Sequence, residues 1–318
     1  MSLPLVDVVT PGLQTTVQDL GRWGHQAEGV PVAGAMDPSS HCLANLLVGN
    51  ARSAASLEVT LAGPTLRFSD ARRVAIAGAE FVVTLDGVVV PHGTAVAVQP
   101  GATLHFGERR SGARAYIAVE GGFDVAPVLG SRATHLPSGM GGVAGRALVR
   151  RDRLPLGSRG ARLPGRGASA PGTTIAHVPA GTDPVRVRVL PGPHLDRFAD
   201  VALEALTGAP YRIRIDANRM GYRLSGPRLT HCAGADIIPE ATPIGSLQVP
   251  ASGQPVLLMA DRQTSGGYAK IATVIAADIP VVAQAAPGDR LLFEICTRAV
   301  ALRALIERER WLMAAEPA

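Results

Sequence analysis

Four consecutive polar residues follow an apolar run at residues 256–259: Asp261, Arg262, Gln263 and Thr264. An aspartate in such a place can act as a general base or orient a water, and an arginine can hold an anion. Glutamine and threonine can bind an amide. Gly266-Gly267 then lets the backbone turn sharply or approach a ligand closely. This mixture of polar types after an apolar strand favours a functional site at residues 261–268 over an ordinary turn.

Lys270 is the only lysine of the chain, and it lies two residues beyond this segment. Its ammonium group would stabilise negative charge on a bound molecule. A single lysine in an arginine-rich chain can also stand there by chance, and the sequence leaves both interpretations open.

Asn218-Arg219 follows another predicted strand, at residues 211–215. Because a guanidinium offers two parallel donors, this pair would bind a carboxylate or a phosphate. A polar turn would have the same composition, and the two alternatives are equally consistent with the sequence.

Two N-terminal segments carry further polar side chains outside any apolar periodicity. Residues 15–22 contain Asp19 and Arg22, which would either bind a polar ligand or pair with each other in a turn. Asp37 would either join a pocket or cap a helix, because Asp is a favoured N-cap and a proline follows it. Taken alone, this second segment favours the cap.

Several other kinds of site are not expected. The lysine follows Ala269 and no glycine, so there is no Walker phosphate loop, and there is no Met-Lys-Met biotin attachment site. The histidines lack metal-binding spacing, and we predict no metal site. Cys42, Cys232 and Cys296 are too few and too far apart for a disulfide framework.

The composition favours short strands joined by tight turns. Of 318 residues, 47% are hydrophobic but only 4% aromatic, and 36 glycines and 25 prolines punctuate the chain, which argues against a helical bundle and against disorder. The net charge of +5 comes from scattered basic residues, so we expect no nucleic-acid partner. The N-terminus lacks a signal-peptide pattern, and Asp278 and Pro280 interrupt the longest apolar stretch. We therefore expect a cytoplasmic protein that contacts no membrane.

The pattern of elements predicts a mainly-β barrel or sandwich. Short apolar runs such as 74–77 and 81–85 read as separate strands, and Asp86-Gly87 indicates a hairpin. Helices are expected at residues 37–49, 195–206 and 299–313. Residues 99–106 are similar to residues 286–293, which fits either a duplicated barrel or two ordinary turns.

Six segments occur together and in one order along the chain. They are residues 15–22 (TTVQDLGR), 34–37 (GAMD), 44–50 (ANLLVGN), 57–60 (LEVT), 218–221 (NRMG) and 261–268 (DRQTSGGY). On these segments the chain, from residue 5 to about 296, resembles the biotin-dependent carboxyltransferase family. That family includes the C subunit of bacterial ATP-dependent 5-oxoprolinase, is often labelled allophanate hydrolase subunit 2, and is similar to part of urea carboxylase. Ser265 stands where the family pattern has Thr, and the hydroxyl is kept.

The resemblance implies two cyclophilin-like β-barrel domains. From the composition we place them at residues 1–155 and 185–318, joined by a Gly/Pro/Arg-rich linker at residues 156–184. It also implies two partners, the A and B subunits of 5-oxoprolinase, of which the second is similar to a kinase inhibitor. The implied activity is ATP-dependent opening of 5-oxo-L-proline to L-glutamate, in which phosphorylation of the amide oxygen precedes attack by water. Because the chain has no nucleotide motif, we expect ATP at a shared or partner-subunit site, and activity only with the partners bound.

On the resemblance we expect roles for eight side chains. Asp261 orients or activates the attacking group, Arg262 and Arg219 hold the substrate carboxylate or phosphate, and Gln263 and Asn218 bind the amide. Asp19, Arg22 and Asp37 complete the pocket. From the residues themselves, Lys270 joins the catalytic group by stabilising negative charge, and Thr264 joins the substrate-binding group. We expect these side chains to share one pocket.

Two other functions fit the same sequence. One is the acceptor half of a biotin-dependent urea or amide carboxylase, which predicts a biotinylated partner. The other is a non-enzymatic antagonist that sequesters the kinase-inhibitor-like partner, which predicts a stable complex without turnover. The cluster of polar motifs favours an enzyme.

Overall fold

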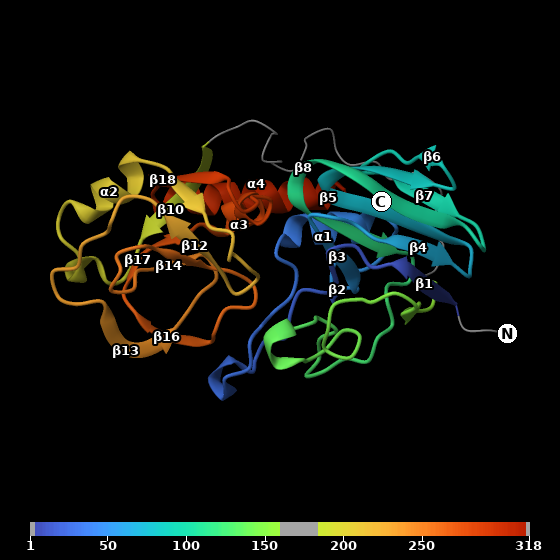
Figure 1. Cartoon of the computed structure of the whole chain (residues 1–318), viewed down its shortest axis with the longest axis horizontal. Coiled ribbons are helices and arrows are strands. Elements are labelled where there is room, and N and C mark those ends of the chain that lie inside the picture. The colour runs from blue at the N-terminus through green and yellow to red at the C-terminus, as the bar shows by residue number, and fades with distance from the viewer. Residues whose placement is uncertain (1–3, 160–183, 316–318) are drawn as a thin grey trace. The chain divides into compact units, whose positions relative to one another are not determined.

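The computed structural model describes residues 4–159 and 184–315, which fall into two compact units (Figure 1). Of the described residues, the first unit comprises 4–22, 33–159 and 309–315, and the second comprises 23–32 and 184–308. Residues 23–32 and 309–315 thus group differently from the predicted domains. The predicted boundary itself stays a prediction, because most of the linker at 156–184 lies outside the described residues.

The first unit is built on a nine-stranded sheet that curls into a half-barrel. Its strands are β1 (Leu5–Thr10), β2 (Gln14–Gln18), β3 (Ser56–Thr60), β4 (Thr65–Phe68), β5 (Arg72–Leu85), β6 (Val88–Val89), β7 (Ala95–Val98), β8 (Thr103–Val119) and β9 (Arg153–Pro155). Their order is β2-β3-β8-β4-β1-β9, and β5 pairs with β6, β7 and β8. Alternate strand residues such as Val6, Leu57 and Ile117 form the buried core.

Residues 74–77 and 81–85 belong to one strand, β5, and the prediction of two separate strands is wrong. Between them the register against β8 shifts at Gly78 and Glu80, and Gly78 has a φ of 96°. A bulge of this kind bends a strand without ending its pairing. The Asp86-Gly87 hairpin is confirmed, because both residues have positive φ and join β5 to β6.

α1 (Pro38–Leu47) covers one face of this sheet, against β5 and β8 (Figure 1). The Asp37 carboxylate accepts the Ser40 N–H at 2.9 Å, and a proline opens the first turn. The buried side chains Ala44, Leu47 and Tyr116 join helix and sheet. The capping alternative for Asp37 is therefore confirmed.

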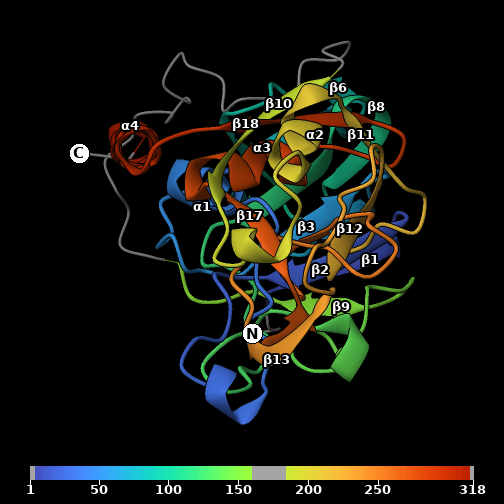
Figure 2. The same cartoon turned by 90° about the vertical axis from the view of Figure 1, so that its left-hand side faces the viewer.

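The second unit is a closed seven-stranded barrel with the order β10-β17-β14-β15-β12-β11-β18. Its strands are β10 (Val185–Pro191), β11 (Tyr211–Ile213), β12 (Gly221–Ser225), β14 (Ser246–Gln248), β15 (Val256–Leu258), β17 (Lys270–Val274) and β18 (Arg290–Ile295). Val187, Leu247 and Phe293 fill its buried core. A separate two-stranded sheet, β13 (Asp236–Ala241) and β16 (Ser265–Tyr268), lies below the barrel in both views (Figures 1 and 2).

The remaining elements are short except for the last helix. They are α2 (Ala202–Gly208), α3 (Ile279–Ala283), α4 (Arg298–Ala314) and the 3₁₀ turns η1 (Gln26–Glu28), η2 (Leu136–Ser138), η3 (Leu195–Arg197) and η4 (Ala276–Asp278). The prediction of one helix at residues 195–206 is wrong. Phe198 is extended there, because it is buried and forms a bridge to His231, so the segment splits into η3 and α2.

The predicted mainly-β fold is confirmed. Strands hold 39% of the residues and helices 18%, and the two sheets form one closed barrel and one half-barrel. Within the described part of the chain, no helix is long and apolar enough to cross a membrane.

Candidate functional site

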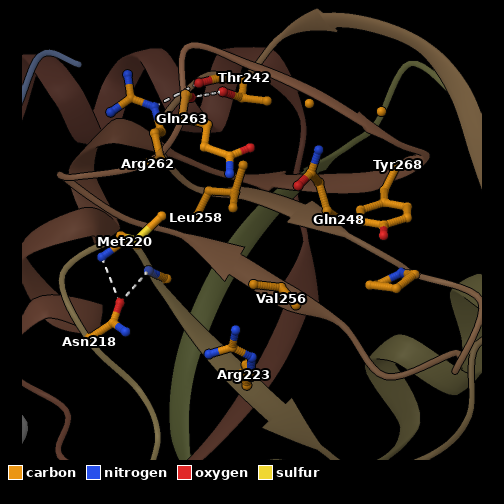
Figure 3. A pocket seen from close by; sticks show the side chains of 14 residues that line it. Asn218, Met220, Arg223, Thr242, Gln248, Val256, Leu258, Arg262, Gln263 and Tyr268 are labelled. Carbon is orange, nitrogen blue, oxygen red and sulfur yellow. Dashed lines mark hydrogen bonds between the residues drawn. The ribbon is translucent and has the colours of Figure 1, made fainter. Parts of the chain in front are cut away.

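The second unit contains a cavity of about 380 Å³, here named the second-unit cavity (Figure 3). Strands β12, β14, β15 and β16 and the segments preceding β12 and β16 form its wall. Fourteen residues line it: Asn218, Met220, Gly221, Arg223, Thr242, Gln248, Pro250, Val256, Leu258, Arg262, Gln263, Gly266, Gly267 and Tyr268. The charged residues among these fourteen, Arg223 and Arg262, are both basic, so the wall favours an anionic ligand.

The polar segment singled out from the sequence reaches this cavity because its backbone is fastened to a neighbouring turn. The Asp261 N–H donates to the Arg219 carbonyl at 2.8 Å, and the Met259 N–H donates to the Met220 carbonyl at 3.0 Å. β16 then pairs with β13. Of the predicted site residues, the cavity brings together three: Asn218, Arg262 and Gln263.

Asp261 and Arg219 form a buried ion pair with each other. The guanidinium donates Nε and Nη2 to the two carboxylate oxygens at 3.0 and 2.9 Å, and the side chains are only 1% and 4% exposed. Each charge is therefore neutralised by its partner, and neither residue lines the cavity. This geometry gives the pair a positioning role, because it holds the 218–221 turn against the 259–264 segment. The predicted direct contacts of both residues with substrate stay predictions.

Arg262 has a different environment from Arg219. Its guanidinium donates to two neutral backbone carbonyls, from Nε to Thr242 at 2.6 Å and from Nη1 to Met259 at 3.5 Å. Burial lowers the pKa of Arg262 to about 10, so the group is still a cation at neutral pH. Among the described residues, no carboxylate pairs with it. The cavity wall thus holds a half-buried positive charge without a counterion.

Gln248 and Gln263 point toward each other across the cavity (Figure 3). Gln248 is 7% exposed, and its Nε2 has no hydrogen-bond partner within the described residues. Sequence reasoning missed Gln248. It stands between Leu247 and Val249, both fully buried, and the alternation of a strand predicts that such a polar residue faces solvent.

Gly266 keeps the space beside Gln248 open. A Cβ at residue 266 would lie 2.6 Å from Gln248 Nε2 and 3.0 Å from Thr242 Cγ2, so the end of the Gln248 side chain would have to move. A Cβ at Gly267 would meet nothing nearer than the Ile237 carbonyl at 3.4 Å, an ordinary contact. The first glycine of the pair therefore permits the observed position of the Gln248 amide, while the second has no such effect.

The other second-unit residues predicted from the sequence serve the cavity indirectly or lie outside it. Asn218 lines it but also accepts the Met220 N–H through Oδ1 at 2.9 Å, which shapes the turn (Figure 3). Lys270 is 2% exposed and donates to Glu240 at 2.7 Å, which lowers the pKa of that carboxyl. Thr264 binds Thr242 through its backbone carbonyl at 3.1 Å. Neither Lys270 nor Thr264 lines the cavity.

Asp19 and Arg22 belong to the first unit, where both fasten the same loop. The Asp19 carboxylate accepts the Ser131 hydroxyl at 2.7 Å and the Arg132 N–H at 2.6 Å. Arg22 is 1% exposed and donates to the Ala133 carbonyl at 2.5 Å. These contacts show structural roles. That Asp19, Arg22 and Asp37 share a pocket with the second-unit residues stays a prediction.

Glu58 is the centre of a buried network in the first unit. It is 1% exposed, and its Oε2 accepts the Tyr116 hydroxyl at 2.7 Å and the Met36 N–H at 2.8 Å. The Tyr116 oxygen accepts the Asp37 N–H at 2.8 Å. Burial, with the nearby negative charges of Glu58 and Asp37, raises the pKa of Tyr116, so the phenol stays protonated and donates. The GAMD and LEVT segments thus meet for structural reasons.

A family model described as the carboxyltransferase domain, subdomain A and B, matches residues 28–295. The C subunit of Escherichia coli 5-oxoprolinase is 36% identical over 307 residues, and the match spans 96% of each chain. The urea amidolyase of Saccharomyces cerevisiae is 33% identical, and the match spans 91% of this chain but only 16% of that one.

A solved structure gives the same relationship in three dimensions. The crystal structure of the Kluyveromyces lactis urea amidolyase superposes with a TM-score of 0.91 at 30% identity, covering all of this chain and 20% of that one. The matches in sequence and in structure both extend over the first and the second unit. The chain belongs to the carboxyltransferase domain, subdomain A and B family.

Proposed function

We propose that the chain is the C subunit of an ATP-dependent 5-oxoprolinase and opens 5-oxo-L-proline to L-glutamate together with the A and B subunits in the cytoplasm. The observation that carries this proposal is the match to the C subunit of the E. coli enzyme, which is 36% identical and spans 96% of both chains. The match to the yeast urea amidolyase is 33% identical and spans only 16% of that protein.

The chemistry of the reaction explains why partners are needed. A five-membered lactam resists direct attack by water, so its amide oxygen is first phosphorylated by ATP. One water then adds to the ring carbon, the C–N bond breaks and the nitrogen takes a proton, which gives an acyl phosphate. A second water hydrolyses the acyl phosphate to glutamate and inorganic phosphate. We place ATP at a shared or partner-subunit site, because the sequence has no Gly-Lys phosphate loop.

The residues of this chain would bind and orient the lactam before the partner acts on it. The second-unit cavity offers amide groups from Gln248 and Gln263 and a cation from Arg262, within a volume typical of a site for a small molecule. The buried Asp261–Arg219 pair keeps the segment that bears Arg262 and Gln263 in place.

Reconstitution of the complex tests the proposal. The chain is co-expressed with the products of neighbouring genes, and glutamate is measured after addition of 5-oxo-L-proline and ATP. Glutamate is expected only when ATP and all three subunits are present. A stable complex that forms no glutamate would contradict the proposal and favour the non-enzymatic antagonist.

Carboxyl transfer from biotin to urea is the second candidate. The observation that favours it is the TM-score of 0.91 to the urea amidolyase over the whole of this chain. This candidate requires a biotinylated partner, since the sequence has no biotin attachment site of its own. Urea-dependent consumption of carboxybiotin by the chain would support it, and its absence with a loaded biotin carrier would exclude it.

A further inference from the structure

We infer that the second-unit cavity binds a small cyclic amide bearing a negative charge, with Gln248 reading the amide and Arg262 holding the anion. The inference rests on the proposed function only for the choice of ligand. Two groups of the cavity wall support it: the Gln248 amide nitrogen has no hydrogen-bond partner within the described residues, and the Arg262 cation has no carboxylate beside it there.

Gln248 is the first of these groups. The residue is 93% buried, yet its Nε2 donates no hydrogen bond within the described residues. A buried polar group without a partner lowers stability, and nearly all such groups in folded proteins are satisfied. Because Gln248 also lines the cavity, a ligand is the partner that it lacks.

The shape of a lactam matches this amide. In a five-membered lactam the ring fixes the amide in the cis form, so its N–H and C=O point to the same side. One glutamine amide can therefore donate to the C=O and accept from the N–H in a closed pair of hydrogen bonds. Gln263, which faces Gln248 across the cavity, is exposed and can bind the other lone pair of the same carbonyl (Figure 3).

Arg262 is the second group. The buried cations Arg219 and Lys270 each have a carboxylate within 3.0 Å, but Arg262 binds only backbone carbonyls. A half-buried charge without a counterion is costly. An anionic ligand would remove that cost, and a guanidinium suits a carboxylate because of its parallel donors.

The rest of the wall fits the carbon ring of such a ligand. Met220, Val256 and Leu258 present apolar side chains (Figure 3), and the volume of about 380 Å³ suits a single ring with a substituent. Urea, the substrate named for related proteins, is also an amide, but it has neither a ring nor a charge. The experiment therefore compares the binding of 5-oxo-L-proline with the binding of urea.

The test measures binding to the full chain without ATP or partners, by calorimetry or NMR titration. Four probes divide the ligand into parts: 5-oxo-L-proline, cyclopentanecarboxylate (ring and anion), 2-pyrrolidinone (ring and amide) and urea. 5-oxo-L-proline is expected to bind most tightly. If the wild-type chain binds none of the probes, or binds urea as tightly as 5-oxo-L-proline, the inference is overturned.

Two variants assign the groups. Gln248→Met is expected to weaken the binding of 5-oxo-L-proline about tenfold or more and to leave the binding of cyclopentanecarboxylate unchanged. Arg262→Met is expected to weaken the binding of both anionic probes and to leave the binding of 2-pyrrolidinone unchanged. Arg262→Lys should recover part of the lost affinity for the anionic probes. Arg212→Met, on the exposed face of β11, is the matched control and should change none of them. If a Gln248 or Arg262 variant lost affinity equally for all four probes, or lost affinity for none of them, the assignment would be overturned.

The inference and the proposed function fail in different ways. If 5-oxo-L-proline binds as described but the reconstituted complex forms no glutamate, the proposed function is wrong and the cavity assignment survives. If the complex forms glutamate at the full rate with Gln248→Met, the assignment is wrong and the function survives.

Discussion

The chain buries polar groups in two places that differ in how their hydrogen bonds are satisfied. Around Glu58 in the first unit, carboxylate, phenol and backbone groups meet at 2.7 to 2.8 Å. In the second-unit cavity, Gln248 Nε2 and the charge of Arg262 lack such partners within the described residues.

The difference separates stability from function. A satisfied buried network stabilises the fold, and the loss of one member leaves the others unpaired. An unsatisfied group lowers stability, so it is retained for another reason. Variants of the first unit are therefore expected to change the free energy of unfolding, and variants of the cavity are expected to change ligand binding.

Glu58→Ala is expected to have the largest effect. It leaves the Met36 N–H and the Tyr116 hydroxyl without their acceptor in the buried network, which should lower the free energy of unfolding by about 3–5 kcal/mol. Urea unfolding at neutral pH measures this. Glu58→Gln keeps one acceptor oxygen and should lose less. A change below about 1 kcal/mol for the alanine variant would show that the network is not stabilising.

His41 is expected to make stability depend on pH. It is fully buried beside Ser56, and burial lowers its pKa from 6.5 to about 4. The unfolded chain therefore binds the proton more readily than the folded chain. The contribution of neutral His41 to the free energy of unfolding is fully present above about pH 6.5. It is lost as the pH drops toward 4, by up to about 3 kcal/mol. Unfolding measured across this range should show less slope in His41→Asn, and an equal slope would contradict the assignment.

Asp37→Ala is expected to have a smaller effect, through the start of α1. Loss of the cap on the Ser40 N–H should cost about 1–2 kcal/mol. Thermal unfolding measures it, with Asp37→Asn as a milder control, since asparagine also caps. Similar losses in both variants would mean that the charge of Asp37, and not its cap, is what matters.

Gly266→Ala is expected to have the smallest effect on stability, with a large effect on binding. The new methyl group would displace Gln248, while Gly267→Ala meets only ordinary contacts. Binding of 5-oxo-L-proline should fall in the first variant and persist in the second. If both variants bind equally, Gln248 does not need the space that Gly266 provides.

Part of this organisation could be predicted from local sequence. Asp37 before a proline marked the start of α1, and Asp86-Gly87 marked the β5–β6 turn, because both depend on neighbouring residues. The 261–268 segment was singled out because polar types follow an apolar strand, and Arg262 and Gln263 do line the second-unit cavity, while its function stays a prediction. Residues 99–106 and 286–293 each form a turn and the start of a strand, which leaves the duplication open.

The rest depends on contacts that sequence does not display. Asp261 forms an ion pair with Arg219, which lies 42 positions away in the sequence. Two residues that were each predicted to contact the substrate therefore contact each other. Gln248 was missed because strand alternation places it on the outer side, where β16 covers it. The helix expected at 195–206 divides because the bridge of Phe198 to His231 overrides local helical preference.

The most direct test of the contrast between the two regions is urea unfolding of Gln248→Met with and without 5-oxo-L-proline. A ligand that binds only the folded chain raises its stability. The variant should be at least as stable as the wild type without ligand, and only the wild type should gain stability when 5-oxo-L-proline is added. A variant that is less stable without ligand, and that gains as much as the wild type with it, would show that Gln248 belongs to the fold and not to a binding site.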